Sequence, residues 1–94
     1  MVFVMKKYFV IIVSGQVQGV SFRSYAKQNA DTLKITGYAK NLKDGTVEII
    51  AEGHEQNMQE FIEKIKTGTE NAKVENMIIT ERNNLQNFPT FEVF

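Results

Sequence analysis

The sequence predicts an α+β fold in which two helices pack on one face of an antiparallel sheet. Two observations lead to this prediction. Apolar residues follow strand spacing and helical spacing in the order strand, helix, strand, strand, helix, strand. The chain has 94 residues, of which 43% are hydrophobic, and this is enough for one apolar core. We therefore expect a single domain over residues 1–94.

The first part of the chain supplies a strand, a loop and a helix. The predicted strand is Lys7–Ser14, a nearly continuous run of β-branched and aromatic residues, which is typical of a strand covered on both faces. Gly15–Ser21 follows with two glycines and no helical period, so we expect a loop. The helix should begin at Phe22, with Ser21 as its N-cap. Its apolar residues recur at helical spacing and are Phe22, Ala26, Ala30 and Leu33.

The clearest turn of the chain is Leu42–Gly45, because an Asp-Gly pair supplies the positive φ that tight hairpins need. A second amphipathic helix should end at Gly68, since glycine is common at helix C-termini. The remaining predicted elements are the strands Tyr38–Asn41 and Thr46–Glu52, the helix Glu55–Lys66, the strand Val74–Thr80, and a candidate short strand at Thr90–Phe94.

This order of elements is that of the ferredoxin-like α/β sandwich, a split βαβ arrangement written βαββαβ. A crossover helix joins the first two strands, so these strands should run parallel, with the third strand between them. Their carboxyl ends then open at the same edge of the sheet. We therefore expect the loop Gly15–Ser21 to meet Asn41, although the two are far apart in the sequence.

Composition argues against several classes of site and partner. The chain has no cysteine and a single histidine, His54, which disfavours disulfides, iron–sulfur clusters and histidine-type metal centres. Lysine plus arginine equals aspartate plus glutamate at 11 each, so bulk charge gives no reason to bind nucleic acid or acidic lipid. We expect no cofactor, no nucleic-acid partner and no membrane association.

The amino-terminal residues have only part of the pattern of a signal peptide. A basic pair precedes an apolar run, but the run Tyr8–Val13 is shorter than the usual ~7–15 residues and no small-residue cleavage site follows it. We therefore expect a cytoplasmic protein that keeps its first strand. Met5 is an alternative start of the chain, with Met1–Val4 as an extension.

The glycine loop is the first candidate for a functional site. A strand, a glycine-rich loop and a helix start form an anion-binding geometry, because main-chain N–H groups converge near the positive end of the helix. The loop leads into Arg23, one of only two arginines in the chain. A planar guanidinium suits a tetrahedral dianion. The alternative interpretation is a tight turn followed by a surface arginine.

Two more residues lie near the expected meeting point. Asn41 ends a strand just before the hairpin, and asparagine favours turns, so the simpler interpretation is a turn residue. Gly37 either allows two backbones to pack closely or only ends the linker after the helix, and the second interpretation is favoured. His54 is interpreted as the start of the second helix.

At these positions the sequence is similar to a known family. Residues 15–23, GQVQGVSFR, resemble the G-x-V-Q-G-V-x-F-R signature of the acylphosphatase family, and residues 37–47 resemble its second signature, G-[WYF]-[AV]-x-N-x-x-x-G-x-V. The resemblance extends from Tyr8 to Phe94. Its departures are Ser21 in a slot often filled by glycine, His54 where many relatives have proline, and residues 68–70 in place of a Gly-Pro-rich turn.

The resemblance implies an enzyme that hydrolyses carboxyl-phosphate anhydrides to a carboxylate and inorganic phosphate. It implies that Arg23 grips the phosphate together with main-chain N–H groups, and that Asn41 holds and orients the attacking water. The residues of this phosphate cradle are Gln16, Val17, Gln18, Gly19, Val20, Ser21 and Phe22. We expect a monomer that acts on a small-molecule acyl phosphate, needs no metal, and is inhibited by inorganic phosphate or sulfate.

Two alternatives stay open at this point. A ferredoxin-like RNA-binding module would need exposed aromatic residues on the sheet and a basic face, and the zero net charge counts against it. A regulatory domain would bind an anion in the loop without turning it over. The motif residues address only the phosphoryl end of a substrate, so the sequence does not predict the acyl group.

Overall fold

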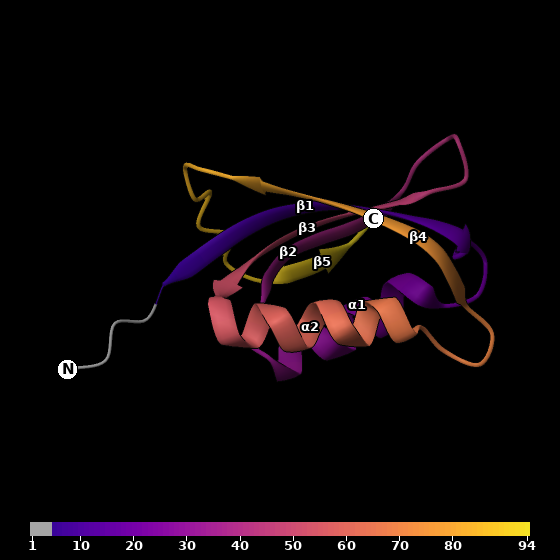
Figure 1. The fold of residues 1–94 in the computed structure, drawn as a ribbon, viewed down its shortest axis with the longest axis horizontal. Helices are drawn as coiled ribbons and strands as arrows, with labels where there is room; N and C mark the ends of the chain where they lie inside the picture. Colours follow the sequence, from indigo (N-terminus) through magenta and orange to yellow (C-terminus); the bar gives the residue numbers. More distant parts are fainter. Residues whose placement is uncertain (1–4) are drawn as a thin grey trace.

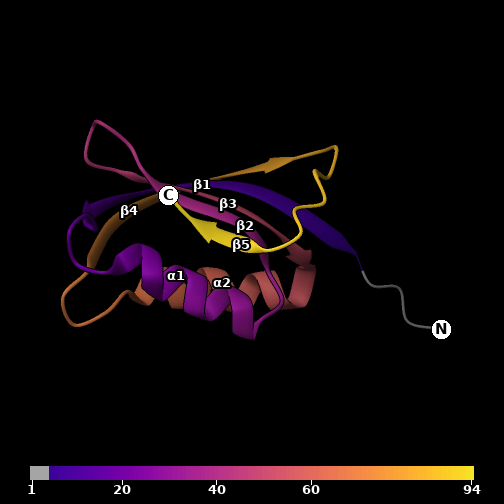
Figure 2. The same ribbon diagram turned by 180° about the vertical axis from the view of Figure 1, so that it is seen from behind.

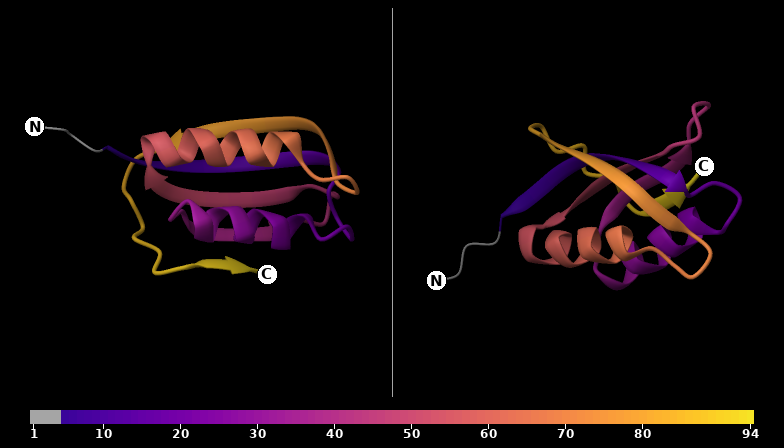
Figure 3. Two further views of the ribbon diagram at one scale, coloured as in Figure 1. Left: turned by 90° about the horizontal axis from the view of Figure 1, so that it is seen from below. Right: turned by 45° about the vertical axis from the view of Figure 1, so that its right-hand side comes forward.

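The computed structural model describes residues 5–94, so the extension Met1–Val4 lies outside the described residues. Two helices cover one face of a five-stranded sheet, which confirms the ferredoxin-like prediction (Figure 1; Figure 3). The elements in chain order are β1 (Lys6–Gln16), α1 (Phe22–Thr32), β2 (Thr36–Asn41), β3 (Val47–His54), α2 (Glu55–Thr67), β4 (Lys73–Arg82) and β5 (Phe91–Val93).

The strands lie side by side in the order β4-β1-β3-β2-β5. Because β3 is antiparallel to both β1 and β2, these two strands run parallel to each other, as predicted. β5 pairs with the outer edge of β2 in parallel, so the sheet is mixed and not purely antiparallel. The reason is that β4 and β5 occupy opposite edges, and the connection between them enters at the end where β2 begins.

The first strand is longer than the sequence pattern predicts. That pattern places Gly15 and Gln16 in the loop, whereas they pair with Val74 and Lys73 of β4 beyond a register shift after Ser14. The register shift is a bulge, and it lets the ladder continue where the apolar run has stopped. The loop therefore consists of residues 17–21 only.

The two faces of β1 differ in burial. Ile11 and Val13 are fully buried on the side of the helices, whereas Val10 and Ile12 stay half-buried on the other face. The prediction of a strand covered on both faces is therefore wrong. The apolar run reflects the central place of β1 between β3 and β4, not a second layer.

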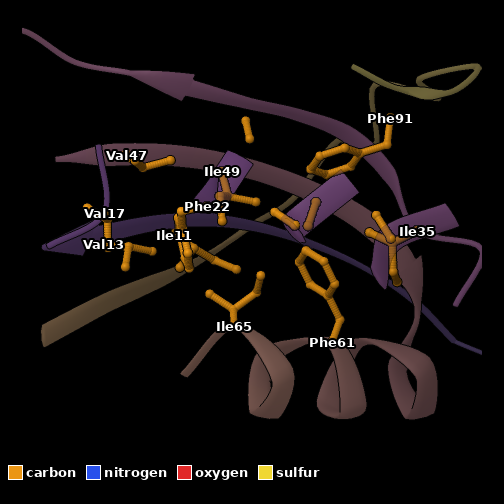
Figure 4. Close-up of a cluster of buried hydrophobic side chains, with 14 of the residues drawn as sticks. Ile11, Val13, Val17, Phe22, Ile35, Val47, Ile49, Phe61, Ile65 and Phe91 are labelled. Atoms are coloured by element: carbon orange, nitrogen blue, oxygen red, sulfur yellow. The ribbon is translucent and has the colours of Figure 1, made fainter. Parts of the chain in front are cut away.

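The core fills the space between the helices and the sheet (Figure 4). Phe22 of α1, Phe61 of α2 and Phe91 of β5 are each at most 1% exposed. Burial of one such side chain contributes about 1.5–3 kcal/mol. Because Phe22 is the first residue of α1, its burial also fixes the first turn of this helix next to the loop.

The two helices begin and end in different ways. Ser21 occupies the N-cap position of α1, but its φ of 61° is left-handed and its side chain makes no capping hydrogen bond. Ser21 is therefore the N-cap residue, as predicted, but without the side-chain hydrogen bond that a serine usually supplies there. α2 follows His54 and ends at Gly68, as predicted. Within residues 5–94, no helix combines the length and the apolar character needed to cross a membrane.

Gly37 lies inside β2 and not in a linker, which corrects the favoured interpretation. It is buried with φ of 141°, and a Cβ at this position would collide with the main-chain oxygen of Ile50 on β3. Only glycine tolerates both the positive φ and the close approach of a neighbouring backbone. Gly37 thereby sets β2, and Asn41 at its end, close against β3.

The connection between β4 and β5 is held by one buried carboxylate. Glu52 of β3 is 3% exposed, and its carboxylate accepts hydrogen bonds from the main-chain N–H groups of Gln86 and Phe88. Hydrogen bonds to an ionised acceptor are stronger than neutral ones. Glu52 therefore fixes the connection where it passes from β4 to the opposite edge of the sheet (Figure 2).

Candidate active site

The loop after β1 is anchored at both ends by buried side chains. Val17 and Phe22 are each 1% exposed, while Gly19 between them is exposed. Gly19 and Ser21 both have positive φ, at 73° and 61°. Main chain that alternates in this way forms a concave surface lined by N–H groups. The loop therefore has fixed ends and an exposed backbone between them.

The main-chain N–H groups of this loop are unpaired within the part of the chain that the structure describes. Among residues 5–94, no hydrogen bond is donated by the main-chain N–H of any residue from 17 to 22. The first main-chain bond of α1 is donated by Tyr25 to the carbonyl oxygen of Ser21, at 3.1 Å. Unpaired N–H groups at a helix start carry partial positive charge and attract anions.

Arg23 stands in the first turn of α1, on the side of β5. Its Nη1 donates to the main-chain oxygen of Phe94. One helical turn later, Lys27 Nζ donates to the main-chain oxygen of Phe91, 2.9 Å away. A guanidinium carries five N–H donors, so this contact orients Arg23 while leaving it able to bind an anion beside the loop.

Gln18 joins the loop to the β2–β3 hairpin. Its Nε2 donates hydrogen bonds to the main-chain oxygens of Leu42 and Thr46, each at 2.8 Å. Leu42 directly follows Asn41. The loop and the hairpin lie at the same end of the sheet, on the right in Figure 1 and on the left in Figure 2. The loop therefore meets the hairpin that follows Asn41, and its approach to Asn41 itself stays a prediction.

The hairpin itself is a tight turn closed by its own hydrogen bonds. The Leu42 N–H donates to the main-chain oxygen of Thr46 at 2.9 Å, and Gly45 has the positive φ that the turn needs. The Asp44 carboxylate accepts the Thr46 hydroxyl at 2.6 Å and the Thr46 N–H at 3.0 Å. These two bonds, the hydroxyl first, lower the pKa of Asp44.

Asn41 is the last residue of β2 and pairs with Val47 at the start of β3. Its side-chain oxygen, Oδ1, is buried and has no hydrogen-bond donor among residues 5–94. A buried acceptor without a donor costs about 1–3 kcal/mol. A movement of the side chain would have to expose this oxygen before a bound molecule could donate a hydrogen bond to it.

The predicted site residues gather at one end of the sheet, with Gln16 inside β1 and the others in the loop, in α1 and at the end of β2. Sequence reasoning treats Gln18 only as a main-chain donor and misses its side-chain contacts. It also misses the Phe94 oxygen that orients Arg23. The signal that could have identified the Gln18 contacts is its polar side chain next to the buried Val17. No signal in the sequence indicated the contact between Arg23 and Phe94. Residues 5–94 hold no group of three or more His, Asp or Glu placed for a metal ion.

Comparison with known proteins gives consistent matches. The sequence profile of the family described as Acylphosphatase matches residues 9–93. The chain is 43% identical over 83 residues to an acylphosphatase of Bacillus subtilis, covering 88% of this chain and 91% of that protein. It is 49% identical over 73 residues to an acylphosphatase of Caldanaerobacter subterraneus subsp. tengcongensis, covering 78% and 81%. The crystal structure of acylphosphatase from Bacillus subtilis matches with a TM-score of 0.91 and 41% identity, over 96% of this chain and 99% of that one.

Proposed function

Because the chain belongs to the acylphosphatase family, enzymes that hydrolyse acyl phosphates, we propose how its own residues carry the reaction. Arg23 and the main-chain N–H groups of residues 16–22 bind the phosphoryl group of a small-molecule acyl phosphate. Asn41 holds and orients the attacking water. The observation that carries this proposal is the set of N–H groups from 17 to 22 that have no acceptor within residues 5–94.

Binding of the phosphoryl group follows from the chemistry of the loop. The unpaired N–H groups and the guanidinium of Arg23 donate hydrogen bonds to phosphoryl oxygens. The partial positive charge at the start of α1 also favours a dianion. The Phe94 oxygen contacts Arg23 from the side of β5. This contact involves one of the two terminal nitrogens of the guanidinium, and its other donors remain for the phosphoryl group.

The role of Asn41 follows from its unsatisfied amide. Once a movement of the side chain exposes Oδ1, water can donate a hydrogen bond to it and accept one from the amide nitrogen. A water held in this way has a fixed orientation, and Gln18 ties the neighbouring Leu42 to the loop that binds the phosphate. Asn41 therefore acts on the water and not on the phosphoryl group.

The chemical step needs little beyond this positioning. The water oxygen forms a bond to phosphorus while the bond from phosphorus to the acyl oxygen breaks, and the products are a carboxylate and inorganic phosphate. The carboxylate is a good leaving group, so orientation and stabilisation of the phosphoryl charge supply the catalysis. The product phosphate fits the same cradle, and we expect phosphate and sulfate to inhibit competitively.

The test is hydrolysis of benzoyl phosphate by the purified protein, with and without EDTA. We expect turnover that EDTA does not abolish. Arg23→Ala should weaken phosphate binding and slow turnover by about 10²–10³-fold, and Arg23→Lys should rescue poorly because an ammonium cannot make a two-pronged contact. Arg82→Ala, the change at the other arginine, is the matched control. Phosphate binding without any turnover would instead support the regulatory anion-binding alternative.

A further inference from the structure

We propose that the side chain of Gln18 is a positioning residue that sets Asn41 against the phosphate-binding loop. This proposal rests on the proposed function, because it assigns to Gln18 the alignment of the attacking water with the bound phosphoryl group. The two halves of the site come from separate segments of the chain, and the Gln18 contact joins residues that are 24 apart. Because a displacement of about 1 Å between reacting groups slows a reaction strongly, a contact between the two segments has to keep them aligned.

The geometry at Gln18 fits this task. Both hydrogens of its amide nitrogen are engaged, one with the Leu42 oxygen and one with the Thr46 oxygen, each at 2.8 Å. These two oxygens flank the turn that directly follows Asn41. The Gln18 side chain is part-buried, so its hydrogen bonds are less exposed to competition from water than surface bonds are.

Each half of the site is otherwise held by its own contacts. Val17 and Phe22 anchor the loop through buried side chains. The hairpin is closed by bonds internal to it, between Leu42 and Thr46 and between Asp44 and Thr46. Among residues 5–94, Gln18 makes the hydrogen bonds that cross from the loop to the hairpin. Its removal should therefore shift one half against the other without dissolving either.

The expected consequence is a loss of turnover with little loss of phosphate binding. The cradle is made by main-chain N–H groups and Arg23, all of which a change of the Gln18 side chain retains. The hairpin loses two donors and moves, and Asn41 moves with it. A displacement of about 1 Å between reacting groups can cost about 10²-fold in rate.

Gln18→Met keeps the length of the side chain and removes both donors. We expect kcat for benzoyl phosphate to fall by about 10- to 100-fold, while the inhibition constant of inorganic phosphate changes by less than about threefold. Gln59→Met on the exposed face of α2 is the matched control, with unchanged kinetics. In an Asn41→Ala background, Gln18→Met should reduce kcat by less than about threefold, because the residue through which it acts is gone.

Gln18→Glu provides a second variant of the same shape, which lacks the donors and sets a charge against two carbonyl oxygens. A urea unfolding curve identifies the variants that fold. A folded Gln18→Met or Gln18→Glu protein with normal kcat would overturn the proposal, as would full additivity with Asn41→Ala. Absence of turnover in the unmodified protein would instead contradict the proposed function, so the two failures are distinguishable.

Discussion

Two polar side chains at opposite ends of the sheet, Glu52 and Asn41, differ in whether their buried oxygens receive hydrogen bonds. Near the end where β3 finishes, the Glu52 carboxylate receives the N–H groups of Gln86 and Phe88. At the end where β2 finishes, Oδ1 of Asn41 receives no donor among residues 5–94. Satisfied polar groups stabilise a fold, and unsatisfied ones cost stability. The Glu52 end therefore contributes to the stability of the fold, whereas the Asn41 end is the place where we propose that a ligand binds.

The largest effect on turnover should follow from a substitution of Asn41, whose oxygen receives no donor among residues 5–94. Asn41→Ala removes the group that we propose orients water but no donor to phosphate, so we expect kcat to fall by about 10²–10³-fold while phosphate still binds. The free energy of unfolding should not fall, since the lost amide oxygen made no hydrogen bond and its burial was unfavourable. Kinetics and phosphate titration of the folded variant test this, with Asn71→Ala as control. A near-normal kcat would return Asn41 to the role of a turn residue.

A smaller effect, on stability and not on turnover, should follow from a substitution of Glu52. In Glu52→Gln one N–H keeps an acceptor, but the other faces the amide nitrogen and is left unpaired. We expect the free energy of unfolding to fall by about 1–3 kcal/mol, with kcat within about twofold of the unmodified protein because the change is remote from the site.

Urea unfolding measures this loss, with Glu60→Gln on the exposed face of α2 as the control. A loss of activity without a loss of stability would show that the two ends are not separate in function.

The end of the sheet that holds the candidate site is more predictable from the sequence than the end that holds Glu52. Strand and helix periods place the elements, and the parallel arrangement of β1 and β2 brings the loop to the end of the sheet where β2 finishes, without any knowledge of side chains. Glu52, by contrast, sits in an alternating strand where a glutamate indicates a solvent-facing position. Its burial depends on a connection more than thirty residues later in the chain.

The same reason limits prediction within the site. Gln18 and Phe94 act through contacts 24 and 71 residues away, and no local period encodes such pairs. Gly37 was ambiguous because its neighbour Ile50 is supplied by another strand. The pattern of one sequence fixes spacing along an element, whereas these contacts depend on how the elements pack.

Tyr38 contacts residues that belong to both ends of the sheet. Its ring packs edge-to-face against Phe88, which Glu52 holds, and against Phe94, whose main-chain oxygen contacts Arg23, at centroid distances of 6.1 and 5.5 Å. The Tyr38 hydroxyl donates to the Glu48 carboxylate at 2.9 Å. Burial, followed by this hydrogen bond and the charge of Glu48, raises the pKa of Tyr38 from 10.0 to about 12.

The smallest expected effect is therefore an alkaline dependence of stability. A folded-state pKa raised from 10.0 to about 12 means that the contribution of Tyr38 is fully present below pH 10 and is lost as pH rises toward 12. Because Tyr38 is only half-buried and solvent screens its interaction with Glu48, the loss should be modest. Tyr38→Phe keeps the ring and both aromatic contacts but removes the proton, so it should flatten the decline in unfolding free energy over this range. Tyr25→Phe on α1, away from Glu48, should leave the decline in place. Urea unfolding at each pH measures the free energy of unfolding. If it declines equally in Tyr38→Phe and in the unmodified protein, the hydrogen bond between Tyr38 and Glu48 does not stabilise the fold.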